Sequence, residues 1–248
     1  MINLSLGTLA EILGKRVDNL ADLRFCGVTI DSRNSCEGKL FVAIKGINFD
    51  GHNFVDTAYQ NGATVALVEQ RQQSQIEQIE VADCKLAMGQ LANYWRRFCD
   101  PCVIALTGSN GKTTVKEMVA GILRQNASVL ATKGNFNNEL GLPLTLFQLN
   151  SSHYYAVLEM GASKPGDVAY LADIAKPDVG LVTNIGPAHL EGFISVEGVA
   201  RAKGELYAAL PPNGTAIINH AEPWVEVWEG VNRAEMVCYF NAQSETRI

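Results

Sequence analysis

From residue 102 onwards, short apolar runs alternate with amphipathic stretches along the chain. The apolar runs lack strict alternation, as in parallel strands covered on both faces, and the stretches between them have helical spacing. Alternating strands and helices predict a doubly wound, mostly parallel α/β sheet with right-handed crossovers. The elements expected, in order, are strand 102–106, helix 112–124, strand 128–131, helix 138–148, strand 154–158, helix 166–175, strand 179–183, helix 195–210, strand 215–219, and a last helix and strand through residue 240.

The N-terminal part mixes short strands and helices, which predicts a smaller mixed α/β domain. We expect a helix over 5–13 ending at Gly14, strands at 28–30 and 40–44, a helix over 54–59, and a strand at 64–68. Residues 69–78 are polar and glutamine-rich, and we interpret them as a solvated excursion rather than a core element.

A helix carrying Leu86, Leu91, Tyr94 and Trp95 then leads toward the strand at 102. We therefore place a domain boundary near residue 85. It divides an N-terminal domain over 1–85 from a central domain over 86–248.

The most informative segment follows the first strand of the central domain and reads Thr107-Gly-Ser-Asn-Gly-Lys-Thr-Thr114. A buried strand, a glycine-containing turn and a helix beginning near Lys112 direct backbone N–H groups, a helix N-terminus and one ammonium at a common point. Thr113 stands where a phosphate loop supplies a hydroxyl to Mg²⁺. Leu106 departs from the general pattern, which has a glycine there, and the alternative is a strand-to-helix turn that merely contains glycines. The context favours a nucleotide phosphate site of the P-loop NTPase type.

Length and composition describe an ordinary globular protein. The 248 residues suffice for one large domain or two modest ones, with 47% hydrophobic and 19% charged residues. A formal net charge of -6 argues against nucleic acid or an anionic membrane as the main partner. No run approaches a membrane span and no signal sequence begins the chain, so we expect a cytoplasmic protein.

Among the six cysteines, only Cys99 and Cys102 have a suggestive spacing. A zinc site would need a second pair or nearby histidines. A redox pair stays open, but we favour Cys102 as the first residue of the strand before the phosphate loop.

Further polar residues follow other strands of the predicted sheet, at the edge where ligands bind in such folds. Glu159 could supply a carboxylate to Mg²⁺, and His189 lies in the turn after strand 179–183. Lys203 precedes Gly204 within a helix, where glycine costs roughly 1 kcal/mol. Close approach of another group would explain that glycine. Taken singly, each of these residues also has an ordinary structural explanation.

Several segments together resemble one family, the ATP-dependent ligases that build the peptide of peptidoglycan precursors. The matching segments are the phosphate loop, Gly134-Asn-Phe-Asn-Asn-Glu-Leu-Gly-Leu-Pro143, Glu159-Met-Gly-Ala162, Asn184-Ile-Gly-Pro-Ala-His-Leu-Glu-Gly192, Ala202-Lys-Gly-Glu205, Asp31-Ser-Arg33, Gly38-Lys-Leu-Phe-Val-Ala-Ile-Lys-Gly46 and Asp50-Gly-His-Asn-Phe54. These ligases do not always keep the first glycine of the phosphate loop, which accounts for Leu106.

The resemblance implies an ATP site with Mg²⁺. Lys112 and the amides of the loop would hold ATP, and Lys203 matches a lysine that the family carbamylates. A carbamate carries the negative charge and oxygens that an ammonium lacks as a metal ligand. The implied ATP-binding residues are Gly108, Ser109, Asn110, Gly111, Lys112, Thr113 and Thr114. The implied metal-binding residues are Thr113, Glu159, His189 and carbamylated Lys203. The implied catalytic residues are Lys112, Asn135, His189 and Lys203.

The resemblance also implies substrates. The segments at 137–143 and 187–192 are most similar to the family member that joins D-alanyl-D-alanine to UDP-N-acetylmuramoyl-tripeptide through an acyl phosphate. The residues that match positions contacting the UDP-linked substrate are Ser32, Ile47, Asn48, Phe49 and Asn138. We expect a monomer that binds neither nucleic acid nor membrane.

Family members have a third domain that brings the incoming amine, and this chain is shorter. We therefore expect a fragment whose central domain is incomplete at its C-terminal end and which ligates poorly or not at all. Three alternatives stay open: the relative that adds the third peptide residue, an ATP-binding module acting as a switch, and a non-catalytic binder of UDP-sugar-peptides.

Overall fold

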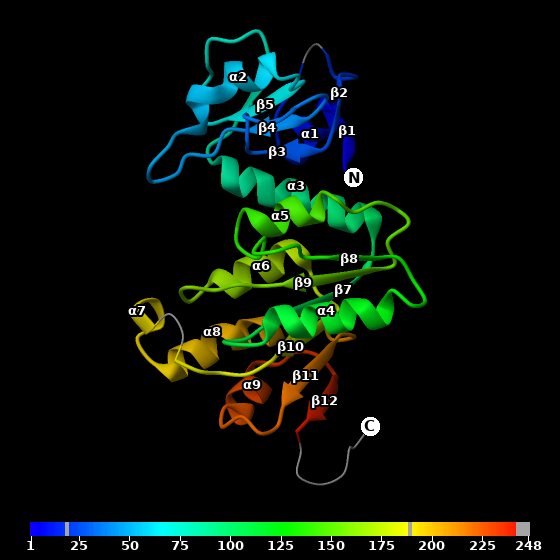
Figure 1. Cartoon of the computed structure of the whole chain (residues 1–248), viewed down its shortest axis with the longest axis vertical. Helices are drawn as coiled ribbons and strands as arrows, with labels where there is room; N and C mark the ends of the chain where they lie inside the picture. The colour runs from blue at the N-terminus through cyan, green and yellow to red at the C-terminus, as the bar shows by residue number, and fades with distance from the viewer. Residues whose placement is uncertain (18–19, 188–189, 242–248) are drawn as a thin grey trace. The chain divides into compact units, whose positions relative to one another are not determined.

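The structure, a computed structural model, describes residues 1–17, 20–187 and 190–241 (Figure 1). The chain forms two compact units: Met1–Phe98 with Leu146–Asn150, and Cys99–Thr145 with Ser151–Ile248. The predicted boundary at 85/86 stays a prediction, and the helix that follows it groups with the first unit. No helix in the described part of the chain is long and apolar enough to cross a membrane.

The first unit is built on a parallel sheet with strand order β3-β4-β5-β6 and a separate antiparallel pair, β1-β2. Ser5 caps the first helix by accepting a hydrogen bond from the Thr8 amide, which explains where that predicted helix begins. The elements are β1 (Asn3–Ser5), α1 (Leu6–Ile12), β2 (Arg24–Cys26), β3 (Val28–Thr29), β4 (Leu40–Val42), the 3₁₀ helix η1 (Gly51–Phe54), α2 (Val55–Gln60), β5 (Val65–Val68), β6 (Glu77–Glu80) and α3 (Cys84–Cys99).

The glutamine-rich segment is not wholly a solvated excursion, so that interpretation was wrong at its C-terminal end. Ile76 is buried in the core, and β6 begins at Glu77 and pairs with β5. Gln78 is also buried, because its amide group is satisfied by the main chain of Gln72. Gln78 Oε1 accepts the Gln72 amide at 2.9 Å, and Gln78 Nε2 donates to the Gln72 carbonyl at 3.0 Å. A buried polar group is tolerated when it is hydrogen-bonded in this way.

The second unit contains a parallel six-stranded sheet with strand order β12-β11-β10-β7-β9-β8. It confirms the predicted mostly parallel α/β sheet, and Cys102 opens β7 as predicted. The elements are β7 (Cys102–Thr107), α4 (Lys112–Leu123), β8 (Val129–Ala131), α5 (Gly141–Leu146), β9 (Tyr155–Glu159), α6 (Asp167–Ala175), β10 (Val179–Val182), α7 (Leu190–Phe193), α8 (Val196–Ala208), β11 (Thr215–Asn219), α9 (Val225–Val231) and β12 (Met236–Phe240).

Helices cover both faces of this sheet (Figure 1). The chain crosses from β7 to β8 in one direction through α4, and from β9 to β12 in the other through α6, α8 and α9. Right-handed crossovers therefore place α4 on one face and the other three helices on the opposite face. The central strand β7 lies between β10 and β9, so the loops that follow these three strands meet at one edge.

Gly204 has the close neighbour that the sequence led us to expect. A Cβ at this position of α8 would lie 2.9 Å from Cδ1 of the buried Trp228 on α9. The Trp228 indole N–H also donates to the Ala200 carbonyl at 3.0 Å. The glycine therefore lets α8 and α9 approach closely, at a point one residue from Lys203.

Candidate nucleotide-binding site

The loop between β7 and α4 has a backbone that requires glycine at two positions. Gly108 has φ 149° and Gly111 has φ 77°, both in the region that side chains disfavour. A Cβ on Gly108 would also lie 1.9 Å from Thr183 Oγ1. Gly111 is the N-cap of α4, so the first amides of that helix are exposed at the loop.

Hydrogen bonds fix this loop to the segment that follows β10. The Ser109 amide donates to the Asn184 carbonyl at 2.9 Å, and the Gly186 amide donates to Ser109 Oγ at 2.9 Å. The Thr183 hydroxyl donates to the Asn110 carbonyl at 2.7 Å. The phosphate loop is therefore held in shape from the neighbouring strand, which favours a preorganised anion site.

Lys112 is the cation of the loop. Its Nζ donates to the carbonyls of Gly108 at 2.8 Å and Ser109 at 3.2 Å, so the ammonium lies over the loop and beside the first turn of α4. In this position it can reach a phosphate group bound by the loop amides.

Glu159, at the end of β9, is buried and its carboxylate has a partner on each oxygen. Oε2 accepts the Thr113 hydroxyl at 2.9 Å, and Oε1 accepts the Asn137 side-chain amide at 2.9 Å. The register that sets Glu159 beside Leu106 of β7 brings the carboxylate next to the loop. Among the described residues no group of three or more His, Cys, Asp or Glu could hold a metal by itself. A hydroxyl and one carboxylate still fit Mg²⁺, which takes oxygen ligands and usually keeps waters and phosphate oxygens.

Lys203 is buried in α8 and its Nζ has no hydrogen-bond or ion-pair partner among the described residues. Desolvation, together with the positive charge of Lys112, lowers the pKa of the Lys203 ammonium to about 8. The two lysines line the same cavity, of about 350 Å³. The residues lining this cavity are Gly108, Ser109, Lys112, Asn137, Asn138, Glu139, Gly161, Ala162, Ser163, Asp167, Tyr170, Leu171 and Lys203.

The two predicted asparagines, Asn135 and Asn138, differ in whether they line the cavity. Asn135 is exposed and lies outside the cavity lining. Asn138 lines the cavity while its side-chain oxygen accepts the Gly141 amide at 2.8 Å, at the start of α5. Asn137 both lines the cavity and donates to Glu159. It lies within a matching segment but is not among the predicted site residues. His189, predicted to ligate the metal and act in catalysis, falls outside the described residues.

Of the residues predicted to contact the UDP-linked substrate, all but Asn138 belong to the first unit. Ser32 follows β3, and Ile47, Asn48 and Phe49 follow β4. Because β3 and β4 are parallel neighbours, these two loops leave the same edge of the sheet. Ser32 is buried, whereas the Ile47 side chain is fully exposed and the Gly46 amide donates to the Phe49 carbonyl to close a turn.

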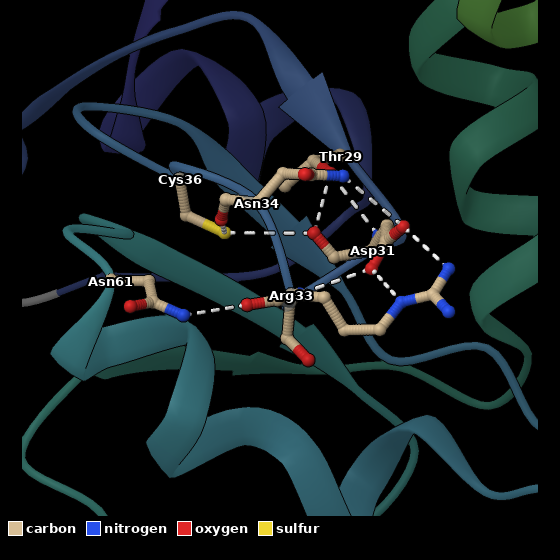
Figure 2. A network of polar contacts seen from close by, with 7 residues as sticks. Thr29, Asp31, Arg33, Asn34, Cys36 and Asn61 are labelled. Carbon is tan, nitrogen blue, oxygen red and sulfur yellow. Dashed lines mark hydrogen bonds and ion pairs between the residues drawn. The ribbon is translucent and has the colours of Figure 1, made fainter.

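Asp31 organises the loop that follows β3, and Figure 2 shows its contacts with Arg33. Its carboxylate accepts hydrogen bonds from the Arg33 guanidinium at 2.8 and 2.9 Å and from the Arg33 amide at 3.0 Å. The Arg33 side chain, followed by its amide, lowers the pKa of Asp31 to about 2. On the other side, the Asn61 side-chain amide donates to the Ser32 carbonyl at 2.7 Å. The loop is therefore fixed by its own side chains and by Asn61, at the end of α2.

Comparison with known proteins identifies the family. The Mur ligase middle domain matches residues 106–247, which is more than half of the chain. The chain belongs to the Mur ligase family. The Mur ligase family catalytic domain also matches residues 24–96, in the first unit. Mur ligases are ATP-dependent ligases, in keeping with the phosphate loop.

Two curated relatives of this chain share one name. The chain is 41% identical over 248 residues to a UDP-N-acetylmuramoyl-tripeptide--D-alanyl-D-alanine ligase of Haemophilus influenzae, covering 98% of this chain and 54% of the relative. It is 43% identical to the enzyme of that name from Escherichia coli, covering 97% of this chain and 53% of the relative. The chain thus spans about half the length of the curated relatives it matches.

Solved structures agree with this similarity. A MurF crystal structure from Acinetobacter baumannii matches with a TM-score of 0.93 and 38% identity, over 97% of this chain and 54% of that one. MurF from Thermotoga maritima, solved in complex with ADP, matches with a TM-score of 0.81 and 34% identity, over 88% of this chain and 51% of that one.

Proposed function

We propose that this chain is the substrate- and ATP-binding part of a ligase that joins D-alanyl-D-alanine to UDP-N-acetylmuramoyl-tripeptide in peptidoglycan precursor synthesis. The observation that carries the proposal is the shared cavity of Lys112 and Lys203 beside the phosphate loop and Glu159, in a chain most of whose length aligns with ligases of that name. Because the chain spans about half of those relatives, we propose little or no ligation by this chain alone.

In this proposal ATP binds with its phosphates on the loop from Gly108 to Thr114. The amides at the N-terminus of α4 would donate to phosphate oxygens, and Lys112 would leave the carbonyls of Gly108 and Ser109 to pair with phosphate. Thr113 and Glu159 would hold Mg²⁺ through oxygen atoms, with His189 as a further ligand. Mg²⁺, when bound, supplies charge neutralisation for phosphoryl transfer.

Lys203 would act as a carbamate. Carbamylation joins an uncharged amine to CO₂ and releases a proton, and the lowered pKa of Lys203 increases the uncharged fraction near neutral pH. The product replaces a buried positive charge with a negative group bearing two oxygens, which can ligate Mg²⁺ beside Lys112. An isotope-labelled bicarbonate experiment checks this step: a carbamate carbon signal is expected by NMR, and Lys203→Met should abolish it.

The reaction would proceed by phosphoryl transfer and then acyl transfer. The terminal carboxylate of the tripeptide would attack the γ-phosphorus of ATP, giving an acyl phosphate and ADP. The amine of D-alanyl-D-alanine would then attack the acyl carbon, and the tetrahedral intermediate would release phosphate as the amide bond forms. No nucleophile from the protein is required, so this chain's residues would act by positioning and by charge. Asn135 and Asn138 would contact phosphate and substrate.

The UDP part of the acceptor would bind the first unit, at the edge of the sheet where the loops of Ser32 and of residues 47–49 leave β3 and β4. The exposed Ile47 and the half-exposed Phe49 would offer apolar surface for the uracil ring, and the loop around the buried Ser32 would offer polar groups.

Two calorimetric titrations test the proposal on this chain. Mg²⁺-ATP should bind with a single site, and UDP-N-acetylmuramoyl-tripeptide should bind independently. ATP binding without any UDP-substrate binding would instead favour a nucleotide switch. UDP-substrate binding without ATP binding would favour a non-catalytic binder of UDP-sugar-peptides.

A further inference from the structure

Lys116 occupies a buried, sheet-facing position of α4, where the helical pattern favours an apolar residue. It lies three residues after Thr113 and four before Ala120, on the face of the helix that packs against the sheet. Its side chain is only 1% exposed. Lysine is almost never fully buried unless it is paired, and a buried charge is costly. An unbranched apolar residue such as methionine would fill this space without that cost. The charged ammonium therefore needs an explanation beyond the filling of space.

The Lys116 ammonium makes two contacts. Nζ donates to the Thr132 carbonyl at 2.6 Å and forms an ion pair with Glu117 Oε1 at 2.8 Å. Glu117 is half exposed, so the ion pair reaches toward solvent, whereas the bond to Thr132 points inward to the end of β8.

Thr132 continues this connection to β9. It is buried, and its amide donates to the Val157 carbonyl at 3.1 Å. Its hydroxyl oxygen accepts the Glu159 amide at 3.0 Å. One residue therefore takes a hydrogen bond from Lys116 at its carbonyl and from the Glu159 main chain at its side chain.

We infer that Lys116 and Thr132 are positioning residues for Glu159: they fix the backbone from which the carboxylate reaches the metal beside the phosphate loop. α4 then holds Glu159 at two points, directly through Thr113 at the carboxylate and through Lys116 and Thr132 at the backbone. This inference rests on the proposed role of Glu159 in Mg²⁺ binding. Partners outside the direct ligands fix ligand orientation, and losing one typically lowers metal affinity about 10–100-fold.

The test uses a matched pair at position 132. Thr132→Val keeps the shape but removes the acceptor for the Glu159 amide, and Thr132→Ser keeps the acceptor. ATP affinity of each folded variant is measured by calorimetry with EDTA and with increasing Mg²⁺. We expect Thr132→Val to bind ATP in EDTA with the wild-type affinity. With Mg²⁺, this variant should need about a tenfold higher Mg²⁺ concentration for the same increase in ATP affinity. Thr132→Ser should behave like the wild type.

Lys116→Met provides a second, independent variant, and combining it with Thr132→Val shows whether the two residues act through one connection. Lys116→Met should shift the Mg²⁺ requirement in the same direction, and the double variant should shift it less than the product of the single shifts. Variants that lose thermal stability but keep the wild-type Mg²⁺ requirement would overturn the inference and leave the proposed function intact. A wild-type chain that binds ATP with no gain from Mg²⁺ would overturn the metal role of Glu159 and the inference with it.

Discussion

The hydroxyl of Thr113 donates a hydrogen bond of 2.9 Å to the carboxylate of Glu159. This bond joins the first turn of α4 to the end of β9 across the phosphate loop. Both groups offer oxygen atoms, so in the proposed function the pair would share one Mg²⁺ once the hydroxyl proton turns toward another acceptor.

Removing the Thr113 hydroxyl should therefore weaken Mg²⁺ binding more than it weakens the binding of ATP without Mg²⁺. We expect Thr113→Val to lose about 1.5 kcal/mol of the Mg²⁺-dependent part of ATP binding, which is roughly tenfold in affinity. Thr113→Ser keeps the hydroxyl and serves as the control. The measurement is ATP titration with and without Mg²⁺; an equal loss in EDTA would argue that Thr113 acts on the loop rather than on the metal.

Lys112 should carry much of the affinity for phosphate. Lys112→Ala removes a hydrogen-bonding charge, for which a loss of about 1.5–3 kcal/mol, or roughly 10–100-fold in ATP affinity, is expected. Lys15→Ala, at an exposed position of the first unit, changes the net charge by the same amount and should leave ATP affinity unchanged. Equal affinity of the Lys112→Ala variant and the wild type for ATP would contradict the phosphate-loop assignment.

Lys203 should make stability depend on pH in CO₂-free buffer. Its pKa is about 8 in the folded chain, against 10.5 for an ordinary lysine. Between those values the unfolded chain binds more protons, so the free energy of unfolding rises with pH; below about pH 8 the cost of the buried charge is fully present. That cost is on the order of 3 kcal/mol.

Lys203→Met should consequently raise the free energy of unfolding more at pH 7 than at pH 10.5. Denaturant unfolding at the two pH values measures the difference. An effect of the same size at both would show that the Lys203 pKa is not lowered in the folded chain.

Replacing two helical glycines with alanine should change the stability of the chain in opposite directions. Gly204→Ala places a Cβ against Trp228 and should destabilise the chain by about 1–3 kcal/mol. A Cβ on Gly121 of α4 would meet no atom within 4 Å, so Gly121→Ala should stabilise by about 0.5–1 kcal/mol. Thermal unfolding of both variants provides the comparison, and a neutral Gly204→Ala would contradict the close packing of α8 on α9.

Much of the second unit could be predicted because its signals are local. The apolar run that became β7, the glycines of the loop and the start of α4 at Lys112 are set by neighbouring residues, and the structure confirms them. Gly204 within α8 likewise predicted the close approach of another group, which the structure identifies as Trp228. Periodicity and turn chemistry determine such elements without knowledge of distant contacts.

Other features depend on contacts that no local pattern reveals. The polar strand β6 forms because it pairs with the edge of β5 and because the Gln78 side chain hydrogen-bonds to the Gln72 backbone. Neither contact is visible in its composition, which by itself indicated a loop. In the sequence, Asn137 and Lys116 have no feature that sets them apart from other polar residues. Their roles follow from the fold, which places Asn137 beside Glu159 and Lys116 beside Thr132. Side-chain partnership across strands follows from the sheet topology, which a single sequence specifies only in outline.

The proposed function is tested most directly by a calorimetric titration of this chain with UDP-N-acetylmuramoyl-tripeptide beside the corresponding UDP-dipeptide. We expect saturable binding of the tripeptide with a clear preference over the dipeptide, since the acceptor of the proposed reaction carries three residues. Preference for the dipeptide would assign the chain to the relative that adds the third residue. Absence of binding by the folded chain to either compound would contradict the proposal that its first unit holds the acceptor.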